Sequence, residues 1–466
     1  MRPAERVIES PRTPPVGTVR ARLAGWGGGP AVLTDVLRAA GLDDLRAAVV
    51  NRRPAPAPGA IARGMGRSYG DAAQLRDGLV LDTTSLRSFE FDRSAGILIA
   101  EAGATLGQLL AAAAPAGWVL PVVPGTQHVT VGGAIAADIH GKNHPVAGTF
   151  GRYVQSLGLL TADGEIAEVS ADRDAALFDA TLGGMGLTGV ILWARIELAP
   201  LSGAGLAVDT DRVRGLDQVF AALLAPGGPH RVAWLDLLGP EPVPAVVSRA
   251  GPLTESEPLG SRARFQPVAS RLTIPEWWPA GVLRPGTVRA YNAYRFRRAP
   301  RQERGRPEPF GAHMFALDGL ANWPRLYGWR GFVQYQLALP RGREAELEEL
   351  IRRLRSSAVP CYLAVLKELG PPNGAPLSFP IAGWTLALDL PRGSPELEPL
   401  LASFDELVAQ AGGRVYLAKD ARLRPDALAA MYPRLDEWRA VRDRADPEGL
   451  WCSDLALRTG LAGGQR

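Results

Sequence analysis

The chain has 466 residues, of which 46% are hydrophobic and 21% charged, and its net charge is +4. This length exceeds one ordinary core and predicts two domains of globular composition. No run of about 20 apolar residues could span a bilayer, and the N-terminus lacks the apolar stretch of a signal peptide. We therefore expect a cytoplasmic protein with a disordered leader over residues 1–14, while peripheral contact with a membrane stays open.

Basic residues are spread along the chain instead of forming a stripe, which argues against a nucleic-acid partner. The densest basic stretch, 294–306, is expected to be a solvated loop that could also face anionic lipid headgroups. Of 52 basic residues only three are lysines, namely Lys142, Lys367 and Lys419. A buried ammonium can lose its proton whereas a guanidinium stays charged, so these lysines are candidates for roles that arginine cannot fill.

Apolar periodicity predicts the secondary structure in chain order. A helix is expected over 105–114, because Thr105 and Gln108 form a capping box ahead of buried leucines. A charged helix over 343–357 is typical of a helix that packs on one face of an antiparallel sheet. Strands are predicted over 79–84, 96–104, 189–198, 331–340, 362–370 and 412–420.

Glycine-rich clusters occur at 63–71, through 124–144, and at 181–191. The first has the spacing Gly-x-Gly-x-x-x-Gly and is followed by a predicted strand, where a Rossmann site requires a helix. Its unobstructed backbone N–H groups would instead form a nest suited to a pyrophosphate. Several such clusters in one region predict a long ligand held by the backbone, which a dinucleotide fits better than a single phosphate.

The stretch DIHGKNH, residues 138–144, could be a metal site, a hydrolase centre or a phosphate-binding site. His140 and His144 have the spacing of metal ligands on a helix, but Gly141 and Pro145 argue against a helix and no third ligand is evident. A hydrolase would need a Gly-x-Ser-x-Gly elbow, which the chain lacks. We favour a loop that lines a cofactor, with His140 as hydrogen-bond donor or support; a purely structural histidine is the alternative.

A resemblance to a known family rests on the segments 62–74, 124–144, 375–384 and 431–438. Together they resemble the vanillyl-alcohol-oxidase type of FAD-binding flavoproteins, and within it the decaprenylphosphoryl-β-D-ribose 2-oxidase family. The resemblance covers nearly the whole chain from Arg22 and implies an α+β fold, with an FAD domain and a substrate domain built on an antiparallel sheet. The implied bounds are 15–205 and 416–466 for the FAD domain and 206–415 for the substrate domain.

The resemblance implies FAD as cofactor, with its pyrophosphate on the loop 62–72. Some relatives tether FAD through a histidine in this loop; here the loop offers Arg67, Ser68 and Tyr69, so we expect dissociable FAD. No metal is expected. The implied FAD contacts are Arg63, Gly64, Met65, Gly66, Arg67, Ser68, Tyr69, Gly70, Asp71, Gly125, Thr130, Val131, Gly132, Gly133, Ala137, Asp138, Ile139, His140, Ile191 and Tyr416.

The implied reaction is oxidation of a secondary alcohol, in which a hydride goes to the flavin and the hydroxyl proton to a base. Lys419 is the first candidate, either as a neutral base or as an ammonium that polarises the hydroxyl; a surface lysine paired with Asp420 is the alternative. The other catalytic candidates are Tyr69, Lys367, Gln336 and His140. The implied substrate pocket consists of Trp234, Met314, Gln334, Gln336, Lys367, Leu369, Thr385 and Ala387.

This pocket departs from the family at Met314, Leu369, Thr385 and Ala387, so the substrate stays open. The leading function is oxidation of the 2-hydroxyl of a polyprenyl-phosphoryl-β-D-ribose to the 2-keto sugar, with a separate NADH-dependent short-chain reductase completing an epimerisation to the arabinose form. The second is oxidation of a soluble sugar or polyol. The third is binding of flavin or a lipid-linked sugar without turnover.

Overall fold

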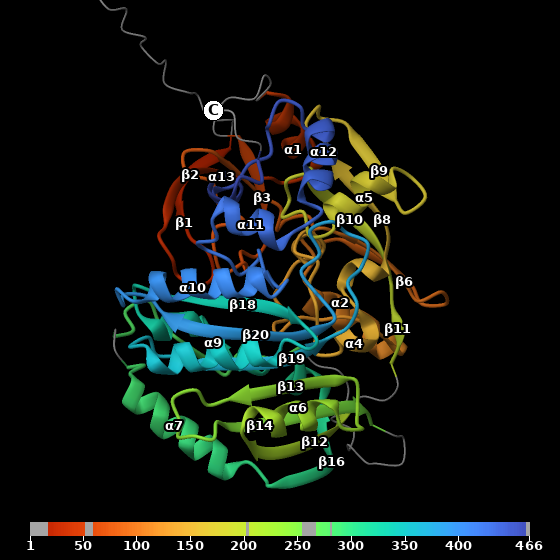
Figure 1. Cartoon of the computed structure of the whole chain (residues 1–466). Coiled ribbons are helices and arrows are strands. Elements are labelled where there is room, and N and C mark those ends of the chain that lie inside the picture. Colours follow the sequence, from red (N-terminus) through yellow and green to blue (C-terminus); the bar gives the residue numbers. More distant parts are fainter. Residues whose placement is uncertain (1–16, 52–58, 202–204, 254–266, 280–281, 463–466) are drawn as a thin grey trace, which may run out of the picture.

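The computed structural model describes residues 17–51, 59–201, 205–253, 267–279 and 282–462. In Figure 1 two smaller sheets lie above one large sheet, whose strands carry yellow-green to blue colours and come from residues 205–415. The C-terminal helices, in dark blue, return to the upper part. The expected leader, residues 1–14, lies outside the described residues.

The upper part contains a four-stranded and a five-stranded sheet. The first has the order β1-β2-β4-β3, with bounds Thr18–Leu23, Val32–Arg38, Leu79–Asp82 and Ala60–Arg63. The second has the order β5-β6-β10-β8-β9, with bounds Phe89–Asp92, Ile97–Glu101, Val190–Glu197, Val154–Leu160 and Ile166–Ser170. The strands predicted over 79–84, 96–104 and 189–198 are confirmed as β4, β6 and β10.

Two short helices begin side by side against the five-stranded sheet. The predicted capping box is confirmed at the start of α2 (Leu106–Ala113), where the Thr105 side chain accepts from Gln108 N. Helix α3 (Val131–Ala136) has Thr130 as its N-cap, and Thr105 and Thr130 form a backbone bridge. The second glycine cluster therefore starts a helix whose first turn lies beside that of α2.

The large sheet has eight strands, all paired antiparallel. Helices α6 (Leu216–Leu224), α9 (Glu344–Ser356) and α10 (Leu397–Gln410) cover one face, where Trp384 contacts Phe220 of α6 and Tyr335 donates to Asp405 of α10. The predictions over 331–340, 343–357 and 362–370 are thereby confirmed. The order is β16 (Gln302–Pro309), β12 (Gly205–Arg214), β14 (Pro244–Pro252), β13 (His230–Leu235), β19 (Leu363–Leu369), β20 (Gly383–Pro391), β18 (Phe332–Pro340) and β21 (Arg414–Val415).

The register of this sheet decides which side chains share its other face. Gln336 lies opposite Ala387, which lies opposite Val365, which in turn lies opposite Trp234. Because side chains directly opposite each other and two apart along a strand point the same way, one face collects a set of polar and small residues. This site face carries Trp234, Gln334, Gln336, Val365, Lys367, Leu369, Thr385, Ala387 and Asp389.

Two expectations about local structure are wrong. The strand expected over 412–420 ends at Val415, because Tyr416 O accepts from Lys419 N and Asp420 N and closes a turn. The stretch 294–306, expected as a loop, belongs to α7 (Pro285–Arg298) and β16. Val288 and Asn292, four residues apart, anchor α7 on the sheet, and Asn292 donates to Asp236 of the β13–β14 connection.

A short helix, α4 (His144–Ala147), begins inside the stretch expected to be non-helical. Pro145 is tolerated there because the first helical turn needs no N–H donor at that position. Residues 138–143 are not helical, so His140 and His144 do not share a helix face. Across the described ranges, no helix is long and apolar enough to cross a membrane.

Candidate active site

The first glycine cluster forms a loop with free backbone donors. Among the described residues, the N–H groups of 64–68 have no hydrogen-bond acceptor. A Cβ on Gly64 would lie 2.3 Å from Thr130 Oγ1, so glycine lets this loop touch the N-cap of α3. Five free N–H groups in a row suit an anionic ligand such as a pyrophosphate.

The first turn of α3 differs from the loop because its donors are already used. Val131 N and Gly132 N donate to Ala104 O and Ala102 O, and Gly133 N donates to the Thr130 side chain. Gly132 is needed for packing, since its Cβ would lie 3.0 Å from Ala102 Cβ. A cofactor can therefore meet this turn by close approach at the exposed Gly133, without hydrogen bonds from its backbone.

Asp138 is the first residue of the DIHGKNH stretch, and it ties the upper part to the β19–β20 connection of the large sheet. Its buried carboxylate accepts from Gly151 N at 3.0 Å, from Asn373 Nδ2 at 2.7 Å and from Ser378 Oγ at 3.1 Å. Burial raises its pKa, and these donors oppose that rise. The described residues contain no cluster of three possible metal ligands. Asp138 is thus a structural anchor of the loop that presents His140.

The hydrogen bonds of the buried His140 fix its tautomer. Thr385 Oγ1 donates to Leu337 O at 2.8 Å, so it must accept from Gln336 Nε2 at 2.9 Å. The second proton of this amide points to His140 Nε2 at 3.0 Å, which is therefore an acceptor. The proton lies on Nδ1, a buried atom without a partner among the described residues. Burial and the charges of Lys367, His144 and Lys419 hold the pKa of His140 well below its usual range.

All three lysines of the chain lie in one electropositive interior. Burial lowers the pKa of Lys367 to about 8, and burial together with the charge of Lys367 lowers the pKa of Lys142 to about 8. Burial lowers the pKa of Lys419 to about 7, the charge of Lys367 adds to this effect, and Asp389 opposes it. The three side chains are half-buried, and a cluster of cations with so little solvent is costly unless an anion joins it.

Lys419 lies in the turn after β21, where it meets the first glycine loop. Its Nζ lies 5.4 Å from the centroid of the Tyr69 ring. Burial, followed by the charge of Asp389, raises the pKa of Tyr69 beyond the physiological range. The alternative pairing of Lys419 with Asp420 is not observed, because Asp420 forms its ion pair with Arg458 at 2.9 Å.

Two residues of this interior were missed from the sequence. Asp389 accepts from Gln334 Nε2 at 2.6 Å and from Tyr327 OH at 3.4 Å, and burial raises its pKa. Its alternation with Thr385 and Ala387 could have placed it on the same face. Lys142, which is not among the predicted catalytic residues, donates to His313 O. Only the tertiary structure shows that it lies near Lys367.

The remaining candidates surround this interior. Tyr416 OH donates to Ala137 O at 2.8 Å, and its ring lies 5.2 Å from that of His140. Trp234 is buried on the site face, with the Arg295 guanidinium 4.5 Å from its ring centroid. Met314 ends α8 (Phe310–Met314), directly after the residue whose carbonyl binds Lys142. Ile191 is buried in β10 of the five-stranded sheet.

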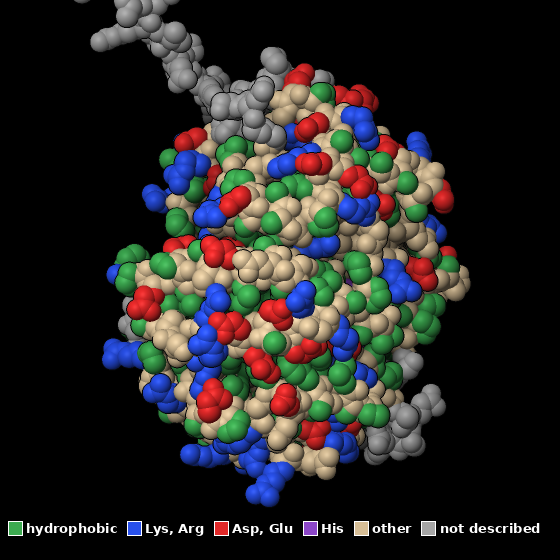
Figure 2. All heavy atoms as spheres, viewed as in Figure 1, with side chains coloured by type: hydrophobic (Ala, Val, Ile, Leu, Met, Phe, Trp, Pro, Cys, Tyr) green, Lys and Arg blue, Asp and Glu red, His purple; other side chains and the backbone are tan. Residues whose placement is uncertain are grey.

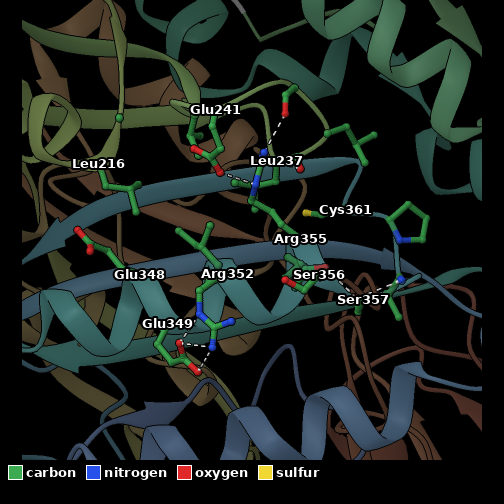
Figure 3. A pocket seen from close by; sticks show the side chains of 18 of the residues that line it. Leu216, Leu237, Glu241, Glu348, Glu349, Arg352, Arg355, Ser356, Ser357 and Cys361 are labelled. Carbon is green, nitrogen blue, oxygen red and sulfur yellow. Dashed lines mark hydrogen bonds and ion pairs between the residues drawn. The ribbon is translucent and has the colours of Figure 1, made fainter.

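A cavity of about 940 Å³ lies elsewhere, between α9, the start of α6 and the start of α7. Figure 3 shows Leu216, Glu241, Arg352, Arg355 and Cys361 around it. Its charges are satisfied locally, since Arg355 donates to Leu237 O and pairs with Glu241 at 2.7 Å. None of the predicted site residues lines it, so it is separate from the lysine interior.

Known families match both ends of the chain. Residues 36–170 match the family described as FAD binding domain, and residues 390–459 match D-arabinono-1,4-lactone oxidase. Over 456 residues the chain is 38% identical to decaprenylphosphoryl-beta-D-ribose oxidase of Mycolicibacterium smegmatis, covering 95% of this chain and 98% of that protein. The chain belongs to the vanillyl-alcohol-oxidase type of FAD-binding proteins. It has their mixed α/β two-domain oxidase fold with a large antiparallel sheet, as expected.

More distant relatives share parts of this pattern. L-gulono-1,4-lactone dehydrogenase of Mycobacterium tuberculosis is 25% identical over 417 residues, covering 85% of this chain and 89% of that protein. Cytokinin dehydrogenase 2 of Oryza sativa subsp. japonica is 30% identical over 198 residues, covering 36% and 33%. The chain is therefore an FAD-dependent oxidoreductase that oxidises an alcohol or sugar. The residues that match the FAD binding domain include the loop 64–68 with its free N–H groups, helix α3 and the DIHGKNH stretch.

Proposed function

We propose that this flavoprotein oxidises the 2-hydroxyl of a polyprenyl-phosphoryl-β-D-ribose to the 2-keto sugar. The observation that carries the proposal is the convergence of the half-buried Lys142, Lys367 and Lys419 in one electropositive interior. A sugar phosphodiester supplies the missing anion and the hydroxyls that the amides Gln334 and Gln336 can bind. The relative with 38% identity, whose name describes such an oxidase, supports the same substrate class.

The residues that would hold FAD lie in the first glycine loop and in the DIHGKNH stretch. The free N–H groups of 64–68 would bind the pyrophosphate, and the unpartnered His140 Nδ1 would donate to the flavin or to the substrate. Loop 62–72 contains no histidine, so we propose dissociable FAD. We also propose that residues 15–205 and 416–466 form the FAD domain and 206–415 the substrate domain, because the eight-stranded sheet draws nearly all its strands from the latter range.

Bound FAD supplies a hydride acceptor, and the protein must supply the base. Lys419 is suited to this role because its pKa, lowered to about 7, leaves much of it neutral at physiological pH. The lone pair of Nζ would accept the hydroxyl proton as the C–H bond breaks. Lys367 has the higher pKa and stays charged, so it would hold the anionic group and keep the Lys419 pKa low. Tyr69, which stays protonated, would donate a hydrogen bond nearby.

Anaerobic flavin reduction tests this function. The FAD-loaded protein would be mixed with a short-chain polyprenyl-phosphoryl ribose while the flavin band at roughly 450 nm is followed, a band that belongs to the oxidised cofactor. Loss of the band that depends on Lys419 would support the proposal. The product should be a 2-keto sugar. Its conversion to the arabinose form by an NADH-dependent short-chain reductase would complete the expected series of reactions. A persistent band would overturn it.

A second candidate is oxidation of a soluble sugar or polyol. Two observations favour it: Ala387 and Thr385 replace the cysteine and asparagine expected in the lipid-linked family, and residues 390–459 match D-arabinono-1,4-lactone oxidase. Bleaching by a soluble sugar, polyol or lactone in the absence of lipid-linked substrate would select this candidate. The fold and the cofactor would be unchanged.

A further inference from the structure

An aromatic surface lies outside the oxidoreductase site. We define it as Leu272, Trp277, Tyr291, Tyr294 and Trp329, all exposed. The two tryptophans are each 79% exposed, which is unusual for the largest apolar side chain. Scattered exposed hydrophobic residues need no explanation, but aromatic residues gathered in neighbouring segments mark an interaction site.

Strand pairing and hydrogen bonds join the segments that carry this surface. β15 (Leu272–Thr273) pairs with β17 (Leu320–Ala321), and Arg325 donates to Ile274 O at 3.0 Å and to Glu276 at 3.0 Å. Trp277 follows the first of these segments and Trp329 the second. The two segments that carry these exposed rings therefore lie side by side.

Helix α7 continues the region on the other side. Tyr362 OH donates to Leu283 O, just before α7 begins, and its ring lies 5.9 Å from that of Tyr327. Along α7, Tyr291, Tyr294 and Arg298 recur at intervals of three and four residues and so share an exposed face. The opposite side of α7 is fixed to the sheet by Asn292.

The charge of helix α7 and of the residues that follow it is almost entirely positive. Between residues 282 and 306 the chain carries eight arginines and a single carboxylate, Glu303. Arg297 and Arg298 are exposed at the end of α7, and Figure 2 shows blue side chains gathered over the lower end of the molecule, where α7 ends in Figure 1. Exposed Trp and Tyr beside arginine match the chemistry of an anionic lipid interface, where rings sit at headgroup level and cations neutralise phosphates.

The aromatic surface lies close to the site. Gln127 Nε2 donates to Val268 O at 2.7 Å, and Asp318 accepts from Gln127 N at 2.8 Å, so both strands of the β15–β17 pair extend from the loop after Gly125. Phe332, three residues after Trp329, donates its N–H to Gly27 O, and Gly27 N donates to Tyr69 O. A substrate whose tail stays in a bilayer could therefore reach this site from a membrane bound to this surface.

We propose that the aromatic surface, together with the arginines of α7, docks the protein on an anionic membrane. The inference rests on the proposed function only in its account of why the site should face lipid. Trp277 and Trp329 would insert at the headgroup level, while Arg297 and Arg298 would contact lipid phosphates. No membrane-spanning element is needed for such reversible binding.

Vesicle co-sedimentation tests the docking independently of catalysis. The full-length FAD-loaded protein would be mixed with phosphatidylcholine vesicles with or without about 30% phosphatidylglycerol, an anionic lipid. We expect binding to the anionic vesicles only, and its loss as salt shortens the screening length to about 3 Å at 1 M. The double variant R297Q/R298Q should weaken binding roughly thirtyfold, from about fivefold for each arginine near the surface.

A second double variant tests the tryptophans, and a third serves as a control. W277S/W329S should weaken binding at least about tenfold without lowering stability, because both rings are exposed. The matched control R87Q/R93Q removes two exposed arginines of the upper part and should bind like the parent protein. Equal binding to both kinds of vesicle, no binding, self-association through this surface instead, or equal losses in all variants would overturn the proposal. Loss of vesicle binding with intact flavin reduction of a soluble short-chain substrate would separate docking from the oxidase function.

Discussion

Replacement of Lys419 tests the proton transfer at the centre of the proposed reaction. Lysine ordinarily titrates near 10.5, and burial together with Lys367 lowers the pKa of Lys419 to about 7. At pH 7 about half of such a lysine is neutral, compared with roughly one in 3,000 for an unperturbed lysine. Loss of a positioned base costs about 10²- to 10⁴-fold in rate, so Lys419→Met should slow flavin reduction by that factor. Lys419→Arg should not restore it, because a guanidinium stays protonated.

The direction of the pH dependence follows from the same charges. Since the neutral amine is the active form, the rate of reduction should rise with pH through the Lys419 pKa and then level off. Lys367→Met removes a like charge and should move this rise to higher pH. Asp389→Asn removes an opposite charge and should move it to lower pH, each by about one unit for a charge within about 6 Å.

Stopped-flow reduction of the FAD-loaded protein from pH 5.5 to 9, followed at roughly 450 nm, measures both effects. FAD content and thermal unfolding of each variant serve as controls for a correctly formed site. A rate that falls as pH rises through 7 would show that the ammonium is the active form. Shifts of Lys367→Met and Asp389→Asn in the same direction would refute the electrostatic coupling.

Four further predictions concern structure, cofactor and thiol reactivity. Asp138→Ala leaves three donors without an acceptor and should lower the free energy of unfolding by about 3 kcal/mol, measured with urea. As a control, Asp174→Ala, which removes an exposed N-cap, should lower it by about 1 kcal/mol. Gly70→Ala would place a Cβ 1.7 Å from Asp420 O and displace the turn that carries Lys419, so purified protein should contain less FAD; unchanged FAD content would contradict this packing. Acid precipitation should release FAD into the supernatant, and flavin that stays in the pellet would show a covalent bond. Electrophiles that add to a thiol should not modify position 387 of the parent protein, because alanine has no nucleophile. They should modify the Ala387→Cys variant, and mass spectrometry would detect the added mass.

The sequence predicted much of the site because chemistry was concentrated in short motifs. Glycine clusters can be recognised without a structure, since their value lies in a missing Cβ, and the FAD-binding match confirms the cofactor. The rarity of lysine in an arginine-rich chain singled out Lys367 and Lys419. Alternation within one strand placed Gln334 and Gln336 on one face, and Gln336 does reach His140 while Tyr335 reaches the opposite helix layer.

Errors arose where tertiary contacts override local preference. The apolar stretch after Gly413 has the composition of a strand, yet only Arg414 and Val415 pair with β18 before the chain turns at Tyr416. The basic stretch 294–306 lacks an apolar period, yet packing of α7 on the sheet and pairing of β16 with β12 give it regular structure. In the first segment a local turn ends the pairing, whereas in the second the deciding partners lie far away in the sequence.

By itself, the sequence determined the kind of ligand and the kind of chemistry: a loop of small residues for a dinucleotide, and a few amines and amides for a polar substrate. The tertiary structure alone decided that Lys142, Lys367 and Lys419 share one interior and that Asp389 joins them. The physical reason is that a period of two fixes which residues of a strand share a face, but not which strand lies beside it. Register across β13, β19, β20 and β18 supplies that missing relation.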